Sequence, residues 1–195
     1  MSRIEKIQRK TSETDIAIEL NLDGSRKSDI DTGIGFFDHM LTHIAKHGRF
    51  DLNVKCKGDL HIDGHHTVED IAIVLGQAFE KALGDKKGIT RFSSCSLPME
   101  DSLANVAIDF CGRPFCIYNV KYTSGKIGDF DVELVEEFCR AFTNNARLNL
   151  HINVPYGTNN HHIAEAIFKA IGRALADAVK IIPGVDDVPS TKGML

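Results

Sequence analysis

Two stretches of the chain begin with the same motif: HHTVEDIAIVLGQAFEKA at residues 65–82 and HHIAEAIFKAIGRALADA at residues 161–178. In each stretch the apolar side chains recur every three or four residues, which is the spacing of one helix face. Each stretch therefore predicts an amphipathic helix whose first turn carries His-His-x-x-Glu. Because one unusual motif opens two helices, the chain is predicted to contain an internal repeat.

The elements that precede each motif also repeat in the same order. The expected elements are a strand at 16–22, a helix at 36–47 and a strand at 50–56 in the first copy, and a strand at 104–110, a helix at 131–143 and a strand at 148–154 in the second. Strands are predicted where apolar residues alternate, and helices where they follow the helical period. The predicted fold class is α+β, with two repeat-related half-domains, each a β-sheet packed against two helices, related by a pseudo-twofold axis.

A short loop rich in glycine and charge, GDKKG at 84–88, is the expected join between the copies. The predicted half-domains are therefore residues 1–88 and residues 89–195. The second half ends in a segment rich in Gly, Pro and Asp from residue 183 onward, which is predicted to be a loop or arm that binds substrate.

Composition excludes several classes of protein. The chain has 195 residues, of which 43% are hydrophobic, so it is long enough to bury a core without disulfides. The net charge of −4 and the lack of any Lys/Arg run longer than two argue against a general nucleic-acid binder. No apolar run reaches the roughly 20 residues that span a bilayer. The N-terminus lacks the apolar stretch of a signal peptide, and the five cysteines include no CxxC pair, so we expect a cytoplasmic protein with reduced thiols.

All nine histidines lie in two windows, 39–66 and 151–162, and this clustering indicates chemistry. In each His-His-x-x-Glu motif the first His and the Glu share a helix face, whereas the adjacent histidines diverge by about 100°. The motif therefore suits two metal ions, or one ion and one substrate contact. Imidazole and carboxylate without thiolate suit Mn, Fe, Co, Ni or Zn. The alternative, two capping histidines with a Glu favoured by the helix dipole, is weakened by the second copy.

The helix before each motif offers further ligands. His39, His43 and His47 follow one another at a spacing of four residues, and Glu137 occupies the repeat position of His39. A carboxylate can replace an imidazole as a metal ligand, so Glu137 is predicted to be one. His43 and His47 correspond to Ala and Asn in the second copy, which favours a substrate contact or a surface position over a paired metal role.

Four basic residues are candidates for binding an anion: Arg91, Arg113, Lys169 and Lys192. Lys169 follows Glu165 by one helical turn and so shares the face of the metal motif. In the tail, Ser190 and Thr191 add hydroxyls to the ammonium and backbone N–H groups of this segment. The two remaining histidines, His61 and His151, are predicted on the polar sides of strands, in structural roles.

Four stretches together resemble the imidazoleglycerol-phosphate dehydratase family of histidine biosynthesis: TSET at 11–14, FDHML at 37–41, DGHHTVED at 63–70 and NHHIAEA at 160–166. The resemblance runs from about residue 3 to residue 195. It implies a hydro-lyase that converts imidazole glycerol phosphate into imidazole acetol phosphate and water, with the substrate held as a metal-bound imidazolate. It also implies two Mn²⁺ per active site, with other divalent transition metals possible, in a homo-oligomer of 24 subunits that share their sites. Some relatives carry a phosphatase domain as well, and we expect this chain to be the monofunctional form.

The resemblance assigns roles residue by residue. It implies that the metal ligands are His39, His65, His66, Glu69, Glu137, His161, His162 and Glu165, although the position of Glu137 is His in some members. It implies that the substrate contacts are Glu13, His39, His47, His65, His66, Glu69, Arg91, Arg113, Lys169, Ser190, Thr191 and Lys192. The expected catalytic carboxylates are Glu13, Glu69 and Glu165, and Glu13 is the candidate for proton transfer.

Two other functions fit the motifs when the resemblance is set aside. The first is a dinuclear metallohydrolase that attacks its substrate with a metal-bound hydroxide. The second is a metal-binding cage without catalytic activity. The hydrolase predicts release of inorganic phosphate, and the cage predicts many weakly bound ions per chain in place of two.

Overall fold

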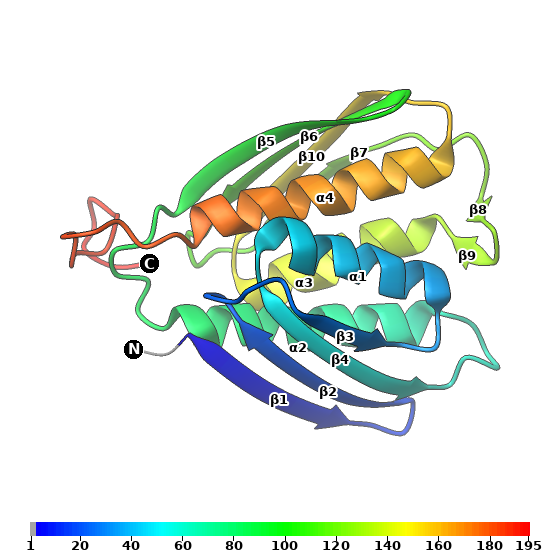
Figure 1. The fold of residues 1–195 in the computed structure, drawn as a ribbon, viewed down its shortest axis with the longest axis horizontal. Helices are drawn as coiled ribbons and strands as arrows, with labels where there is room; N and C mark the ends of the chain where they lie inside the picture. Colours follow the sequence, from blue (N-terminus) through cyan, green and yellow to red (C-terminus); the bar gives the residue numbers. More distant parts are fainter. Residues whose placement is uncertain (1–2) are drawn as a thin grey trace.

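Two four-stranded sheets lie on either side of a layer of helices in the computed structural model, which describes residues 3–195 (Figure 1). The first sheet contains, in spatial order, β1 (Ile4–Lys10), β2 (Thr14–Asn21), β4 (Asp51–Gly58) and β3 (Ser28–Asp31). The second contains β5 (Phe92–Met99), β6 (Ser102–Asp109), β10 (Asn149–Tyr156) and β7 (Phe115–Asn119). In both sheets the first three strands are antiparallel neighbours and the last strand pairs in parallel. The predicted fold class is confirmed, with one sheet in each half of the chain.

Four helices fill the space between the sheets: α1 (Gly35–Gly48), α2 (His65–Leu83), α3 (Glu133–Ala146) and α4 (Asn160–Ala178). The apolar stripe of α2 covers the first sheet and that of α4 covers the second. The helices also pair across the halves, since α1 packs along α4 and α3 packs along α2. Each candidate ligand helix of one half therefore lies beside a motif helix of the other half.

Two of the expected elements differ from the structure. The helix predicted at 131–143 begins at Glu133, because Phe130 and Asp131 form the short strand β9, which pairs with β8 (Lys126–Ile127). Phe130 is buried against Phe36 and Asp131 pairs with Lys126, so the chain is still extended at Asp131 and the helix begins two residues later. The prediction that His61 lies on a strand was also wrong. Strand β4 ends at Gly58 and the N–H of Ile62 donates to the carbonyl of Asp59, so His61 lies in a turn.

Two further expectations about local structure agree with the structure. His151 lies on the exposed side of β10, and residues 183–195 form neither a helix nor a strand. All five cysteines are free thiols. None of the helices within residues 3–195 has the length and apolar character needed to cross a membrane.

Two repeat-related glycines allow the cross-half helix pairs to approach closely. A Cβ at Gly76 of α2 would lie 2.8 Å from the carbonyl oxygen of Phe142 and 2.8 Å from the amide nitrogen of Ala146 in α3. A Cβ at Gly172 of α4 would lie 3.0 Å from the carbonyl oxygen of Ile44 in α1. Because backbone atoms cannot move aside as a flexible side chain can, both crossings depend on the missing Cβ.

Gly76→Ala is expected to reduce the free energy of unfolding by about 1–3 kcal/mol, the range for overpacking a close-packed core. Gly172→Ala should cost less, because its Cβ meets α1 at a longer distance. Gly35→Ala is the control, since a Cβ at this helical glycine has nothing within 4 Å. Urea unfolding of the three variants tests this order, and a loss at Gly35 equal to that at Gly76 would contradict it.

Candidate metal centre

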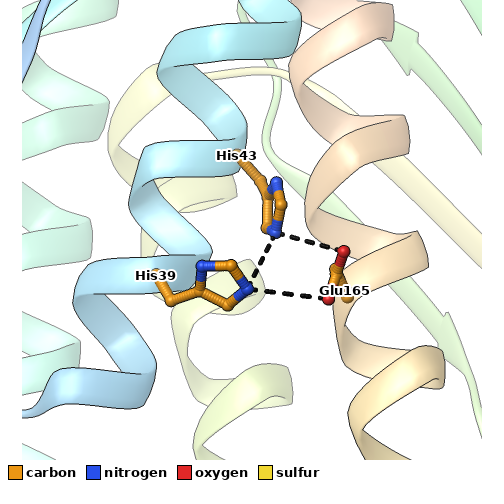
Figure 2. Close-up of side chains that lie close together, drawn as sticks. All are labelled: His39, His43 and Glu165. Atoms are coloured by element: carbon orange, nitrogen blue, oxygen red, sulfur yellow. Dashed lines mark hydrogen bonds and ion pairs between the residues drawn. The ribbon is translucent and has the colours of Figure 1, made fainter.

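The first group of candidate ligands lies where α1 packs along α4 (Figure 2). Nε2 of His39 is 3.1 Å from Nε2 of His43 and 3.6 Å from Oε2 of Glu165, and Nε2 of His43 is 3.4 Å from Oε1 of Glu165. Nε2 of His161, in the first turn of α4, is 3.0 Å from Oε2 of the same carboxylate. We call His39, His43, His161 and Glu165 the α1/α4 cluster. Its members come from both halves of the chain.

Burial and neighbouring charges keep this cluster in the forms that bind cations. Burial alone would raise the pKa of Glu165, but the hydrogen bond from Lys169 and the charge of His43 outweigh it and bring the pKa to about 2. Burial, together with repulsion from His39, lowers the pKa of His43 to about 4. At neutral pH the cluster therefore presents a carboxylate and a neutral imidazole, which are the forms that metal ions require.

The second group of candidate ligands lies where α2 packs along α3. His65 and Glu69, one turn apart on α2, meet Glu137 of α3, and each offers a ligand atom within 4.8 Å of the others. Nε2 of His65 is 3.8 Å from Oε2 of Glu69. We call these three residues the α2/α3 cluster. The structure thus brings Glu137 to His65 and Glu69 in the same way that it brings His39 to His161 and Glu165.

The second histidine of each motif faces away from the cluster on its own helix. Nδ1 of His66 lies 2.9 Å from Oδ2 of Asp59, and Nδ1 of His162 lies 2.7 Å from Oδ1 of Asp101. An ionised carboxylate can only accept, so Nδ1 donates, and Nε2 is left free in the neutral ring. Asp101 also accepts from the hydroxyl of Thr158, and these hydrogen bonds hold its pKa well below the usual range. Both histidines are therefore oriented to present Nε2 away from their own cluster.

Glu13 lies in the turn between β1 and β2, beside His66. Its Oε1 is 3.8 Å from Nε2 of His66, and half of its side chain is exposed. The hydroxyl of Thr11 accepts hydrogen bonds from the backbone N–H groups of Glu13 and Thr14, which shapes the turn. An exposed carboxylate next to a free imidazole nitrogen can accept a proton from a bound molecule.

The candidate anion-binding residues divide between two places. One pocket of about 590 Å³ is lined by Arg91, Arg113, Ser190, Thr191 and Lys192. Arg91 is fixed there by its ion pair with Asp109 and by donation to the carbonyl of Pro189 in the tail. Lys169 lies elsewhere, because its ammonium pairs with Glu165 in the α1/α4 cluster.

This pocket and the metal clusters lie at opposite ends of the molecule. The N–H of Arg91 donates to the carbonyl of Ala178 at the C-terminal end of α4, whereas His161 lies in the first turn of that helix. At a rise of 1.5 Å per residue, His161 and Ala178 are about 25 Å apart. Figure 1 likewise shows the C-terminal tail at the far end from the start of α4. A single chain therefore does not bring its clusters and its basic pocket to one small molecule.

A family model described as imidazoleglycerol-phosphate dehydratase matches residues 32–175. The chain belongs to the imidazoleglycerol-phosphate dehydratase family. It is 55% identical to the imidazoleglycerol-phosphate dehydratase of Acetivibrio thermocellus over 195 residues, which is 100% of both chains. It is 57% identical to that of Clostridium novyi over 187 residues, covering 96% of this chain and 95% of the relative. The predicted membership of the family is confirmed.

A solved structure of the family has the same fold. The crystal structure of imidazoleglycerol-phosphate dehydratase from Staphylococcus aureus subsp. aureus N315 matches with a TM-score of 0.84 and 42% identity, over 92% of this chain and 99% of that one. A crystal structure from Pyrococcus furiosus matches with the same TM-score at 36% identity, over 97% of this chain and 100% of that one. The two-sheet arrangement is therefore that of the family.

Sequence reasoning missed the position of His43. Without a counterpart in the second copy it was expected at the surface or against substrate, but it joins the α1/α4 cluster. The spacing of four residues between His39 and His43 places both on one helix face, and this spacing could have indicated a shared site. His47 lies one turn further along α1, where burial and then the charges of Lys169 and Arg173 lower its pKa. The carboxylates that orient the second histidines, Asp59 and Asp101, also had no ligand motif to mark them.

Proposed function

We propose that this protein removes water from imidazole glycerol phosphate to give imidazole acetol phosphate, as a hydro-lyase of histidine biosynthesis. We further propose that it does so with two divalent metal ions per active site, with Mn²⁺ as the first candidate. The observation that carries the proposal is the placement of both His-x-x-x-Glu pairs beside a third ligand from the other half, in a chain aligned end to end with dehydratases.

The donor sets fit first-row divalent ions. Atoms that bind one ion at about 2.1 Å are separated by about 3.0 Å in an octahedron and about 3.4 Å in a tetrahedron. In the α1/α4 cluster, Nε2 of His161 lies 3.0 Å and Nε2 of His39 lies 3.6 Å from Oε2 of Glu165, which is close to these separations. His39, His161 and Glu165 would hold one ion, and His65, Glu69 and Glu137 the other. Imidazole nitrogens and carboxylate oxygens together suit Mn, Fe, Co, Ni or Zn.

The protein's own residues have four tasks in this reaction. Bound ions would stabilise the substrate's ring in its deprotonated form, from which electrons can flow to the side chain as hydroxide leaves. Glu13 accepts the proton from the glycerol chain, because its exposed carboxylate lies beside the free nitrogen of His66. Arg91 and Arg113 hold the phosphate through charge-assisted hydrogen bonds. Glu69 and Glu165 fix the positions of the cations, while His47 and Lys169 approach the substrate from the same helix pair.

We also propose that each active site is shared between copies of the chain, in an assembly of 24 subunits. The separation of about 25 Å between the start and the end of α4 supports sharing, since the substrate is far shorter. The outward Nε2 atoms of His66 and His162 support it as well. An α1/α4 cluster and an α2/α3 cluster from two different copies, each completed by an outward histidine of the other copy, would form each site together with the basic pocket of a further copy.

Incubation of the protein with Mn²⁺ and imidazole glycerol phosphate is expected to yield imidazole acetol phosphate in the amount of substrate consumed. Nuclear magnetic resonance of the products, with a parallel assay for inorganic phosphate and metal analysis, provides the measurement. Phosphate release without the acetol phosphate would favour the metallohydrolase. Many weakly bound ions per chain without any turnover would favour the cage.

A further inference from the structure

The two clusters differ in the kind of ligand atoms that they offer. The α1/α4 cluster contains three imidazoles and one carboxylate, whereas the α2/α3 cluster contains one imidazole and two carboxylates. Two positions cause this difference. His43 of α1 corresponds to Ala141 of α3, and His39 of α1 corresponds to Glu137 of α3. The repeat therefore gave the chain two sites of unequal chemistry.

The packing of α1 against α4 holds His43 in a position to bind a cation. Its Nε2 lies 3.1 Å from that of His39 and 3.4 Å from Oε1 of Glu165, while only 13% of its side chain is exposed. The next residue, Ile44, meets Gly172 of α4 at the close helix crossing, so the backbone beside His43 has little freedom to move. Ligands already held at cation-binding distances need little ordering when the ion binds.

The α2/α3 cluster has no member as buried as Glu165, and its motif histidine lies further from its glutamate than in the α1/α4 cluster. Nε2 of His65 and Oε2 of Glu69 are 3.8 Å apart, and their side chains are 45% and 40% exposed. Two carboxylates that face each other repel unless a cation lies between them. Carboxylates favour harder cations such as Mn²⁺, whereas imidazole favours cations such as Zn²⁺, Ni²⁺ and Co²⁺ that lie later in the first row.

We propose that His43 is an additional metal ligand and that it makes the two sites of this chain unequal in metal preference. The α1/α4 cluster prefers Co²⁺, Ni²⁺ or Zn²⁺ over Mn²⁺ more strongly than the α2/α3 cluster does. This inference rests on the proposed binding of metal at both clusters. It adds a ligand to the α1/α4 cluster, and it predicts which metal ions each cluster prefers.

Titration of the chelator-treated protein with Co²⁺, followed by visible absorption and by competition with a metal indicator, tests the inference. Uptake is expected in two steps whose affinities differ by at least about tenfold, as for other changes in ligand environment. With Mn²⁺, followed by electron paramagnetic resonance, the two steps are expected to lie closer together. Two Co²⁺ steps of equal affinity would overturn the inference and leave the proposed function intact. Failure to bind either ion would contradict both.

Two variants test whether His43 and Glu137 cause the difference in Co²⁺ affinity between the two clusters. His43→Gln keeps a polar side chain of similar size but removes the imidazole, so the tighter Co²⁺ step should weaken by about tenfold or more. Glu137→His adds an imidazole to the α2/α3 cluster and should tighten the weaker step. His151→Gln, on the exposed face of β10, is the matched control and should leave both steps unchanged. An unaltered tight step in a folded His43→Gln protein would overturn the role of His43, and Glu137→His tests the same ligand chemistry if that variant does not fold.

Discussion

Glu165→Gln is expected to lower kcat/KM for dehydration by at least about a hundredfold, because it removes the one carboxylate of the α1/α4 cluster. Glu165 contacts His39, His43, His161 and the ammonium of Lys169, and only 7% of the residue is exposed. Gln preserves the shape of the side chain but removes its negative charge. The cation then loses an anionic ligand, and Lys169 keeps its positive charge beside the site.

Metal content per chain and kcat/KM should fall together in Glu165→Gln. Glu136→Gln is the matched control, since Glu136 is a partly exposed glutamate on α3 whose carboxylate pairs only with Arg140 among the described residues. That variant should retain two ions per chain and the activity of the unaltered protein. Full activity of Glu165→Gln with two ions bound would show that this carboxylate is not a ligand.

Removal of metal with a strong chelator is expected to abolish dehydration and also to reduce the size of the particle in solution. His66 and His162 lie beside the clusters and present Nε2 away from them, because their Nδ1 atoms are already engaged by Asp59 and Asp101. If those outward nitrogens complete the cation sites of neighbouring copies, the ions link subunits. Loss of the ions then removes the link.

Sedimentation velocity before and after chelation measures the size, and activity is assayed on the same samples. Addition of Mn²⁺ should restore both the large particle and the activity. His162→Gln should weaken assembly in the presence of metal, whereas His151→Gln should not. A particle of unchanged size from which the metal has been fully removed would show that ions do not join the subunits.

The sequence predicted most of the fold and most of each cluster because both depend on local periodicity. The helical spacing of apolar residues at 65–82 and 161–178 places the helices, and the register of the repeat points to Glu137. Helix boundaries that depend on contacts with distant residues could not be predicted from local periodicity. The start of α3 depends on the burial of Phe130 against Phe36, a residue far away in the chain.

By itself, the sequence determined the fold class and a set of metal-ligand candidates, since these follow from residue type and spacing, and it indicated the family through the resemblance of four stretches. The tertiary structure decided which candidates meet. Gly76 and Gly172 let helices of opposite halves approach, and this packing brings His43 to Glu165. The length of α4 also separates Arg91 from the clusters. The predicted metal ligands and the predicted anion-binding residues of one chain therefore lie far apart. The spacing of residues along the chain does not show which helix of one half packs against which helix of the other half. Only the tertiary packing decides that pairing.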